Sequence, residues 1–409
     1  MINRRPFIAY AAAEAFSLGG TRLSMIAIPW LVLTSTGSPT MTGTVAMAEM
    51  LPYVISKFLS GPIVDRIGTK PIAVGADLTS VLAITTIPVL HQVGDLRIAY
   101  LFPVVAIMGT LRGPSDAAKG VLPPRVAEWA GVPMERVTGV QGAIERLASS
   151  AGAAGAGGLV ALFGPAMSLA INAGTFAVSA MIIAFGIPST LKGDDHQTAG
   201  YLADLKEGAH FVRADSVLLG LAIMIAITNL LDQGFTAVML PVWARNTGHG
   251  AGGVGLVLAI FAGFSIVGAL IAAARGEHLP RLLMYTVCFM IGGLPRFVIF
   301  AIATPLPVIM IVCAAGGFAS GFINPIISAV MFERIPRTLT GRVTSLVGAS
   351  AWSLIPFGGL LGGVLISGLG LPPAMLAIGA AYLVATLSPV FVPSFRGLGQ
   401  HAAGASELS

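Results

Sequence analysis

Charged residues are scarce in this sequence. Only 10% of its 409 residues are Asp, Glu, Lys or Arg, whereas 55% are apolar. Soluble domains carry about a quarter charged residues, and a soluble fold of this length could not cover so much apolar surface. The apolar residues form runs of about 20, with glycine and proline inside them, as is typical of transmembrane helices. The sequence therefore predicts an integral membrane protein.

Cysteine and histidine are also scarce, and none lies where a disulfide framework or a histidine proton relay would require it. Cys288 and Cys313 are the only cysteines, and both fall inside apolar runs, which excludes a disulfide framework. All six histidines lie in predicted loops or tails, so a histidine proton relay has no support. No nucleotide-binding loop, zinc pattern or nucleophile with its base is recognisable. We expect no enzyme activity, no cofactor and no metal.

The net charge of +5 reflects an excess of basic residues in loops, and it needs no nucleic-acid partner. If the N-terminus is cytoplasmic, the outer loops hold only Arg97 and Arg245. The other loop arginines and lysines, Lys119 among them, then lie inside. This asymmetry predicts a multi-pass protein of the bacterial cytoplasmic membrane with both termini in the cytoplasm.

Apolar windows predict twelve transmembrane helices. Their expected ranges are Phe7 to Leu33, Thr42 to Ile63, Pro71 to Leu90, Ile98 to Ala118, Val137 to Phe163, Ala166 to Ile187, Val217 to Leu240, Val254 to Ala274, Leu282 to Ala303, Leu306 to Phe332, Val343 to Leu369 and Ala374 to Val390.

The longest polar break separates two six-helix halves. It carries Tyr201, Leu205 and Val212 on one helical face, which predicts a short interfacial helix. The expected organisation is an N-terminal bundle at 1–187, a cytoplasmic linker at 188–216, a C-terminal bundle at 217–395 and a cytoplasmic tail at 396–409.

The two halves repeat each other. Arg136-Val-Thr-Gly-Val-Gln-Gly-Ala in the first half recurs as Arg342-Val-Thr-Ser-Leu-Val-Gly-Ala in the second. Each copy is followed by a glycine pair, Gly157-Gly158 or Gly362-Gly363. A parallel repeat of six plus six helices predicts an all-α transporter with pseudo-symmetric bundles and a site between them.

The loop after the second predicted span reads Gly61-Pro-Ile-Val-Asp65-Arg66-Ile-Gly68-Thr-Lys70. It resembles the signature G-x-x-x-D-[RK]-x-G-x-[RK] of the major facilitator superfamily. Gly61 would let helices approach, Gly68 would permit a tight turn, and Asp65, Arg66 and Lys70 would form a breakable cytoplasmic latch. We expect Asp116, at the inner end of the fourth span, to join this latch.

Further phrases resemble the branch of this superfamily that contains bacterial multidrug, macrolide and siderophore exporters. They are Ala27-Ile-Pro-Trp-Leu-Val-Leu, Asp204-Leu-Lys-Glu-Gly and Gly341-Arg-Val-Thr-Ser. The resemblance implies export by a major facilitator fold. Two motifs depart from the family pattern: the fifth span lacks the glycine-proline kink but keeps small residues, and Arg112 is not followed by the usual residues.

Charges inside the predicted spans are costly in hydrocarbon and indicate partners or a water-filled cavity. Glu14, Arg112, Glu145 and Arg146 lie at similar depths, so we expect them to form one cluster that couples transport to protons. Matching depths also predict two structural ion pairs. These are Arg22 with Glu49, and Lys57 with Asp77.

The seventh span carries a polar stripe that should face a cavity rather than lipid. The stripe consists of Asn229, Asp232, Gln233 and Thr236. Asp232 has one basic candidate inside the spans of its own half, Arg296. If that pair does not form, Asp232 becomes a rival proton carrier.

These features favour a monomeric secondary transporter that exports small amphipathic organic compounds in exchange for protons and that contacts membrane lipids. Export of a lipid or a siderophore-like natural product is the alternative within the same branch. A receptor or regulator derived from the fold is a third possibility, and the intact signature loop and the polar stripe argue against it.

Overall fold

The computed structural model describes residues 4–94, 96–188, 201–275, 281–336 and 339–391. The described part of the chain is helical, and strands are absent from it. The first part of the predicted linker, 189–200, and the predicted tail, 396–409, lie outside the described residues.

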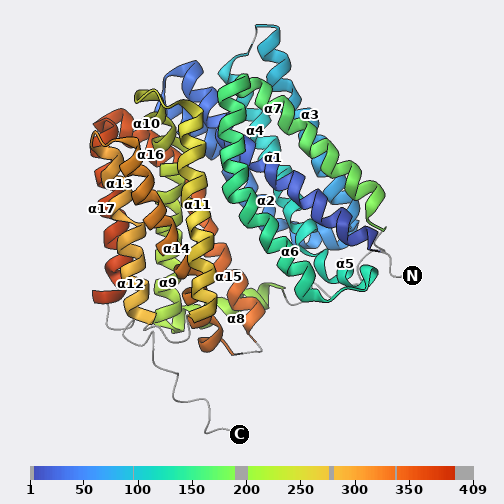
Figure 1. Ribbon diagram of the computed structural model, residues 1–409. Coiled ribbons are helices and arrows are strands. Elements are labelled where there is room, and N and C mark those ends of the chain that lie inside the picture. Colours follow the sequence, from blue (N-terminus) through green and yellow to red (C-terminus); the bar gives the residue numbers. More distant parts are fainter. Residues whose placement is uncertain (1–3, 95, 189–200, 276–280, 337–338, 392–409) are drawn as a thin grey trace. The chain divides into compact units, whose positions relative to one another are not determined.

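Residues 4–188 form eight helical elements (Figure 1). They are α1 (Arg5–Thr36), α2 (Pro39–Ile67), α3 (Thr69–Gln92), α4 (Ile98–Gly120), α5 (Pro123–Ala130), α6 (Met134–Leu147), the π-helix η1 (Ala148–Gly152) and α7 (Ala153–Gly186).

The described residues after 200 form eleven more elements. They are α8 (Tyr201–Ala214), α9 (Ser216–Gly234), the π-helix η3 (Phe235–Met239), α10 (Leu240–Asn246), α11 (Gly250–Arg275), α12 (Arg281–Gly292), α13 (Leu294–Ala301), α14 (Leu306–Arg334), α15 (Thr340–Ser353), α16 (Ile355–Leu369) and α17 (Leu371–Phe391).

The fold class predicted from the sequence is confirmed, because every predicted span coincides with one helix or with consecutive helices. Ten helical stretches in the described residues are long and apolar enough to cross a membrane. One of them, Met134–Gly186, contains two predicted spans, because the chain bends at Gly164, whose φ is 77°. α2 is not among the ten. Its threonines, Glu49 and Lys57 make it less apolar than the others.

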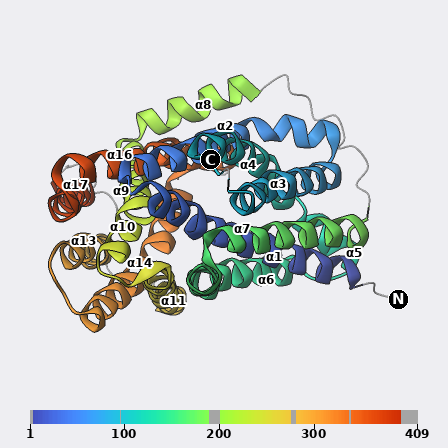
Figure 2. The same cartoon turned by 90° about the horizontal axis from the view of Figure 1, so that it is seen from above.

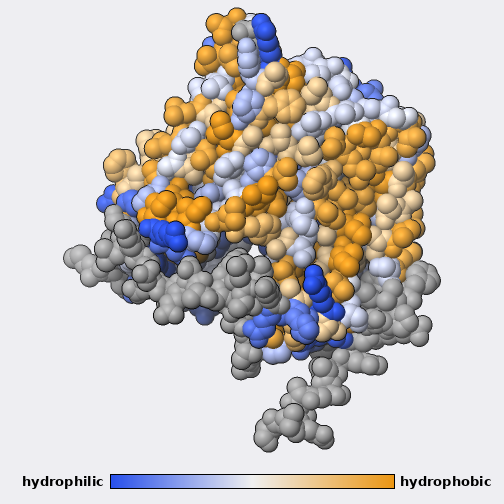
Figure 3. Space-filling view, turned by 180° about the vertical axis from the view of Figure 1, so that it is seen from behind, coloured by the Kyte–Doolittle hydropathy of each residue, from blue (hydrophilic) through white to orange (hydrophobic). Residues whose placement is uncertain are grey.

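The surface of the protein is apolar over broad areas, as a bilayer requires. Leu82, Leu162, Phe185 and Val384 each expose more than 70% of their surface. Figure 3 shows extensive hydrophobic areas on one face. In water these side chains would favour aggregation, so their exposure is consistent with contact to lipid.

Residues group by contact into two compact units. Unit 1 comprises 1–197, 236–259 and 359–364, and unit 2 comprises 198–235, 260–358 and 365–409. These units follow spatial contact rather than chain order, so they differ from the predicted domain boundaries, which remain a prediction.

Within unit 1, α1 packs along α7, and α2 packs along α4 (Figure 2). Gly109 and Gly113, four residues apart on α4, bring the two backbones of the second pair into contact. A Cβ on Gly109 would collide with the carbonyl oxygen of Glu49, and one on Gly113 would lie 2.6 Å from the backbone nitrogen of Lys57. This glycine spacing is a common motif for close packing in membranes, and sequence reasoning missed it here.

Small residues also pack closely along the fifth predicted span, which lacks the glycine-proline kink of the family pattern. A Cβ on Gly157 of α7 would lie 2.7 Å from the Cα of Gly255 in α11, within unit 1. The fifth span continues without a proline and contains η1 instead, from which Ser150 donates to the carbonyl of Ala259 at 3.0 Å. Close packing of small residues was therefore predicted correctly.

In unit 2, α9 packs against α15, α12 against α14, and α13 against α17. The predicted linker helix is present as α8. Its Val212 is buried against Leu218, Ala222, Ile335 and Val343. Arg334 also forms an ion pair of 3.1 Å with Asp215, the residue whose side chain caps α9. The helix is thus attached to unit 2 through its C-terminal end.

The α2–α4 contact allows a test of this packing. Gly109→Ala places a methyl group against the Glu49 carbonyl. Because this overpacks the contact, we expect the free energy of unfolding to fall by about 1–3 kcal/mol. Thermal unfolding of the purified protein in detergent measures the loss. Gly174→Ala is the matched control, because a Cβ there meets nothing within 4 Å. Equal melting temperatures for the two variants would contradict the close contact.

Candidate functional site

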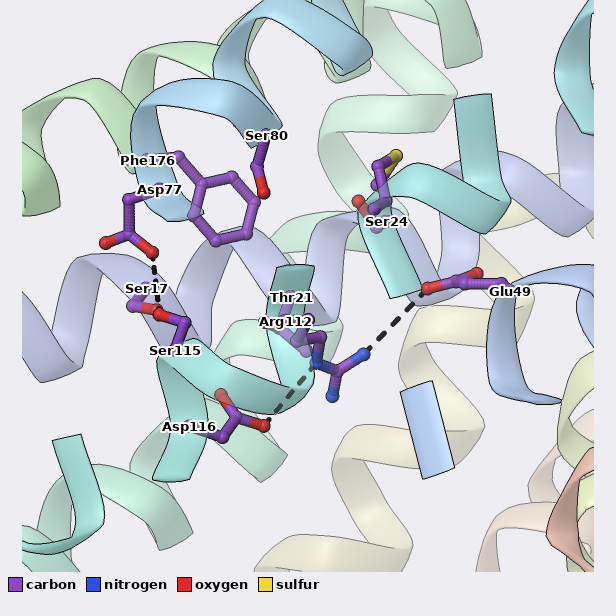
Figure 4. Close-up of a pocket in the computed structure, with 11 residues that line it drawn as sticks. Ser17, Thr21, Ser24, Glu49, Asp77, Ser80, Arg112, Ser115, Asp116 and Phe176 are labelled. Carbon is purple, nitrogen blue, oxygen red and sulfur yellow. Dashed lines mark hydrogen bonds and ion pairs between the residues drawn. The ribbon is translucent and has the colours of Figure 1, made fainter. Parts of the chain in front are cut away.

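A polar pocket lies inside unit 1 (Figure 4). It is bounded by α1, α2, α3, α4 and α7, and its volume of about 20 Å³ has room for about one water molecule. Ser17, Thr21 and Ser24 line it from one face of α1, since they are four and three residues apart. The remaining lining residues are Glu49, Asp77, Ser80, Met108, Arg112, Ser115, Asp116 and Phe176.

Asp77 of α3 lies at one end of the pocket and is fully paired. Its side chain forms a 2.9 Å ion pair with Lys119 of α4, and both are at least 95% buried. Ser115 donates to Asp77 Oδ1 at 2.9 Å, and Ser179 of α7 donates to Oδ2 at 2.8 Å. Lys119 also donates to Ser17 of α1 at 2.7 Å. This network joins four helices, as expected of a structural element.

The network corrects two predictions. Asp77 pairs with Lys119 rather than with Lys57, whose Nζ instead donates to the Tyr53 hydroxyl at 3.1 Å. Lys119 was assigned to a cytoplasmic loop but is buried near the end of α4. Depth comparison failed here because it counts residues along each helix and ignores which face a side chain occupies.

Arg112 lies between two carboxylates. Its guanidinium is 3.9 Å from Glu49 of α2 and 3.8 Å from Asp116, one turn further along α4. Its carbon lies 4.7 Å from the ring centroid of Tyr53, whose hydroxyl donates to Asp116 at 2.9 Å. Figure 4 shows Arg112 between the two acids. Both separations exceed a hydrogen bond, so these pairs are looser than that of Asp77.

This arrangement changes three further predictions. Glu49 pairs with Arg112 and not with Arg22, which donates to Ser149 at 2.8 Å. Asp116 interacts with Arg112 and Tyr53 inside unit 1, and not with the predicted latch. The predicted cluster of four charges does not assemble as ion pairs, because Arg112 turns toward α2.

The other members of that cluster lie apart from Arg112. Glu14 is partly buried one turn before Ser17, and among the described residues it forms no ion pair. Glu145 and Arg146 are exposed on α6.

The signature loop adopts the turn that the sequence predicts. Gly68 has φ 100° and ψ 152°, a conformation that favours glycine, and its N–H donates to Val64. Lys70 donates to the carbonyl of Ile187 at 2.7 Å, whereas Asp65 and Arg66 are exposed. A Cβ on Gly61 would meet nothing within 4 Å, so the close helix approach expected at this residue is not seen.

In unit 2, Asp232 is paired with its basic candidate, a pairing that the sequence left open. Arg296 of α13 forms a hydrogen-bonded ion pair with Asp232. The side chain of Arg296 is 8% exposed, whereas that of Asp232 is 37% exposed. Four rings surround the guanidinium, those of Phe297, Tyr382, Phe235 and Phe261, at 4.7 to 5.7 Å. The pair therefore has an enclosed positive end and an accessible negative end.

The other three residues of the polar stripe, Asn229, Gln233 and Thr236, have different surroundings. Asn229 donates to the backbone carbonyl of Ala351 at 2.9 Å, which ties α9 to α15. Gln233 lies beside Gly358, where an added Cβ would approach its own Cβ to 2.8 Å. Thr236 belongs to η3 and is grouped with unit 1. Only Asp232 brings a charge to the stripe.

Sequence reasoning missed the serines that bind the buried Asp77–Lys119 pair, which are Ser17, Ser115 and Ser179. It also missed the buried contact between Asn172 and Ser24. Asn172 is fully buried and donates to Ser24. A signal was present, because Ser17, Thr21 and Ser24 recur at helical spacing in α1, and Ser115 precedes Lys119 by one turn.

A helical protein that exposes apolar surface and buries ion pairs within its spans is a polytopic membrane protein of the transporter class. The chain belongs to the Major Facilitator Superfamily, whose family model matches residues 10–231 and 222–404.

Named relatives lie in one functional group. The chain is 30% identical to the multidrug efflux pump Tap of Mycobacterium tuberculosis, over 97% of this chain and 95% of that protein. It is also 30% identical to Tap of Mycolicibacterium fortuitum, over 97% and 98%. Macrolide efflux protein A of Streptococcus pyogenes is 22% identical, over 88% and 89%.

Solved structures share the fold at low identity. A mutant of the nucleoside transporter NupG superposes with a TM-score of 0.75 at 14% identity, covering 97% of this chain and all of that chain. A bacterial homologue of the lysosomal transporter Spinster, in an inward-facing and unoccupied conformation, gives 0.71 at 13% identity, covering 97% and 99%. At this identity the likeness concerns the fold alone.

The Asp77–Lys119 pair predicts a strong energetic coupling. Lys119→Met leaves a buried carboxylate without its cation, so we expect the free energy of unfolding to fall by about 3 to 5 kcal/mol. Adding Asp77→Asn to this variant should recover part of the lost stability. A double-mutant cycle on thermal stability measures the coupling. The same cycle with Lys57→Met and Asp77→Asn is the control and should give nearly additive losses. Strong coupling to Lys57 and none to Lys119 would contradict the observed pairing.

Proposed function

We propose that the protein is a secondary active transporter that exports small amphipathic organic compounds in exchange for protons. Identity of 30% to multidrug efflux pumps over nearly the full length of both chains carries this proposal. Alternating access of the two halves would supply the transport cycle. Protons are the proposed driving ion, since carboxylates paired with basic residues inside a membrane are typical of proton relays.

The proposed setting follows from charge and surface. The excess of basic residues in one set of loops supports a bacterial cytoplasmic membrane with both termini in the cytoplasm. Exposed apolar side chains support contact with membrane lipids. We propose a monomer, because all the features that support transport lie within one chain.

Asp232 is the proposed contact for substrate. Its accessible carboxylate, backed by an enclosed Arg296, presents the negative end of a buried pair, which favours a cationic or neutral group over an anion. Asn229, Gln233 and Thr236 complete the proposed polar stripe of the seventh span. Glu14, Glu145 and Arg146 remain proposed members of the coupling machinery, together with Arg112.

Transport in proteoliposomes tests the function. We expect an imposed pH gradient to drive accumulation of ethidium and of erythromycin, with proton movement in the opposite direction. Collapse of the pH gradient with nigericin should abolish accumulation, and protein-free liposomes are the control. Gradient-independent movement of labelled phospholipid, with no transport of either drug, would favour a lipid exporter and contradict the proposal.

The signature loop predicts a separate phenotype. Asp65 and Arg66 are exposed at the turn, where they can form and break contacts during the cycle at little cost to folding. Asp65→Asn should therefore slow ethidium transport while expression and melting temperature change little. Arg66→Lys, which keeps the charge, should transport like the wild type. Wild-type rates for Asp65→Asn would exclude the latch role.

A further inference from the structure

We propose that Glu49 is the carboxylate that binds the coupling proton, with Arg112 as its counter-charge. This inference rests on the proposed proton-coupled export and assigns its ion to a pocket inside unit 1. Sequence depth had placed Glu49 in a structural pair with Arg22, and the observed contacts remove that role.

Burial and missing hydrogen bonds set Glu49 apart. It is 7% exposed, because Gly109 holds the backbone of α4 against α2 at this residue. Its carboxylate lines the pocket and, within the described residues, accepts no hydrogen bond. The single ion pair at 3.9 Å offsets only part of the cost of burying a charge.

Two acids share the guanidinium of Arg112. Asp116 also accepts a hydrogen bond from Tyr53, whereas Glu49 accepts none within the described residues. Glu49, Arg112 and Asp116 together carry one excess negative charge. A proton that enters this group therefore stabilises it most at Glu49, the carboxylate with fewer donors.

The remaining charges around the pocket have other partners. Arg22 of α1 does not line the pocket and donates to Ser149. Lys57 and Tyr53, on α2 itself, interact with each other on the side of Asp116. Asp77 of α3 is held by Lys119, Ser115 and Ser179. The segment 359–364, which packs near α2, has no charged residue.

In this proposal the proton reaches Glu49 through the pocket. The hydroxyls of Ser17, Thr21 and Ser24 line one wall, and the volume admits about one water molecule. In the loading step, a hydronium ion transfers its proton to a Glu49 oxygen, which leaves water and a neutral carboxylic acid. Arg112 then has Asp116 as its only ionised partner in this group. Release to water restores the Glu49 carboxylate and its attraction to Arg112, so the pocket has two charge states.

Glu49→Gln tests the inference, because it mimics the protonated side chain with the same shape. In proteoliposomes we expect this variant to lose ethidium accumulation driven by a pH gradient, down to the level of protein-free liposomes. Ethidium exchange between equal concentrations should persist, because exchange needs no net proton movement. Ethidium keeps its charge across the neutral range, so the pH dependence of its binding reports on the protein, and it should vanish in Glu49→Gln.

Matched variants separate coupling from folding. Glu128→Gln changes an exposed glutamate on α5 and should retain wild-type coupling. Asp116→Asn removes the other partner of Arg112, and its binding of ethidium should stay pH-dependent. Glu14→Gln and Asp232→Asn are the rival carriers. Loss of the pH dependence in either of these, with its retention in Glu49→Gln, would overturn the assignment.

Two failures are distinguishable. If wild-type protein accumulates ethidium on a pH gradient and Glu49→Gln does so equally, the assignment of Glu49 is wrong while proton-coupled export stands. If wild-type protein responds to a sodium gradient and not to a pH gradient, both the proposed proton coupling and the role of Glu49 are wrong.

Discussion

The cost of placing a charge in a medium without water constrains most of this structure. In hydrocarbon each ionised side chain needs an opposite charge, a set of hydrogen bonds or access to water. The chain has few charges within its spans, and those that form ion pairs in the described residues occupy three arrangements. Asp77 and Lys119 are saturated with partners. Arg112 is loosely paired with Glu49 and Asp116 beside a pocket, and the Asp232–Arg296 pair is enclosed at its positive end only.

The saturated and the loose arrangements lie a short distance apart on the same helix, and they have different physical properties. Lys119 and Asp77 lie within hydrogen-bonding distance, and serines from three helices complete their contacts. Arg112 meets its two acids only at 3.8 and 3.9 Å. A saturated pair resists change because any rearrangement loses several bonds at once. The loose group has two carboxylates for one guanidinium and a polar pocket beside it. Reversible protonation is therefore easier in this group than in the saturated pair.

Close helix packing links the fold to this difference. Gly109 and Gly113 bring α4 onto α2, and so Glu49 is buried beside Arg112 rather than in contact with lipid or bulk water. In unit 2, aromatic rings around Arg296 enclose that cation, while Asp232 keeps an accessible edge. Packing residues without charge thus decide how each charge is solvated.

The sequence by itself determined the membrane class, the apolar helical spans, the repeat and the signature turn at Gly68, and it named Arg296 as the basic candidate for Asp232 without deciding that the pair forms. Each of these features depends on local composition, on residue spacing along the chain or, for Asp232, on the presence of one basic residue within the predicted spans of its half. Tertiary structure alone decided that Asp77 pairs with Lys119 and Glu49 with Arg112. Depth along a helix can be counted from the sequence, but a partner also depends on the direction in which each side chain points. Helix rotation and the close approach at Gly109 set that direction, and both arise from packing between segments far apart in the chain.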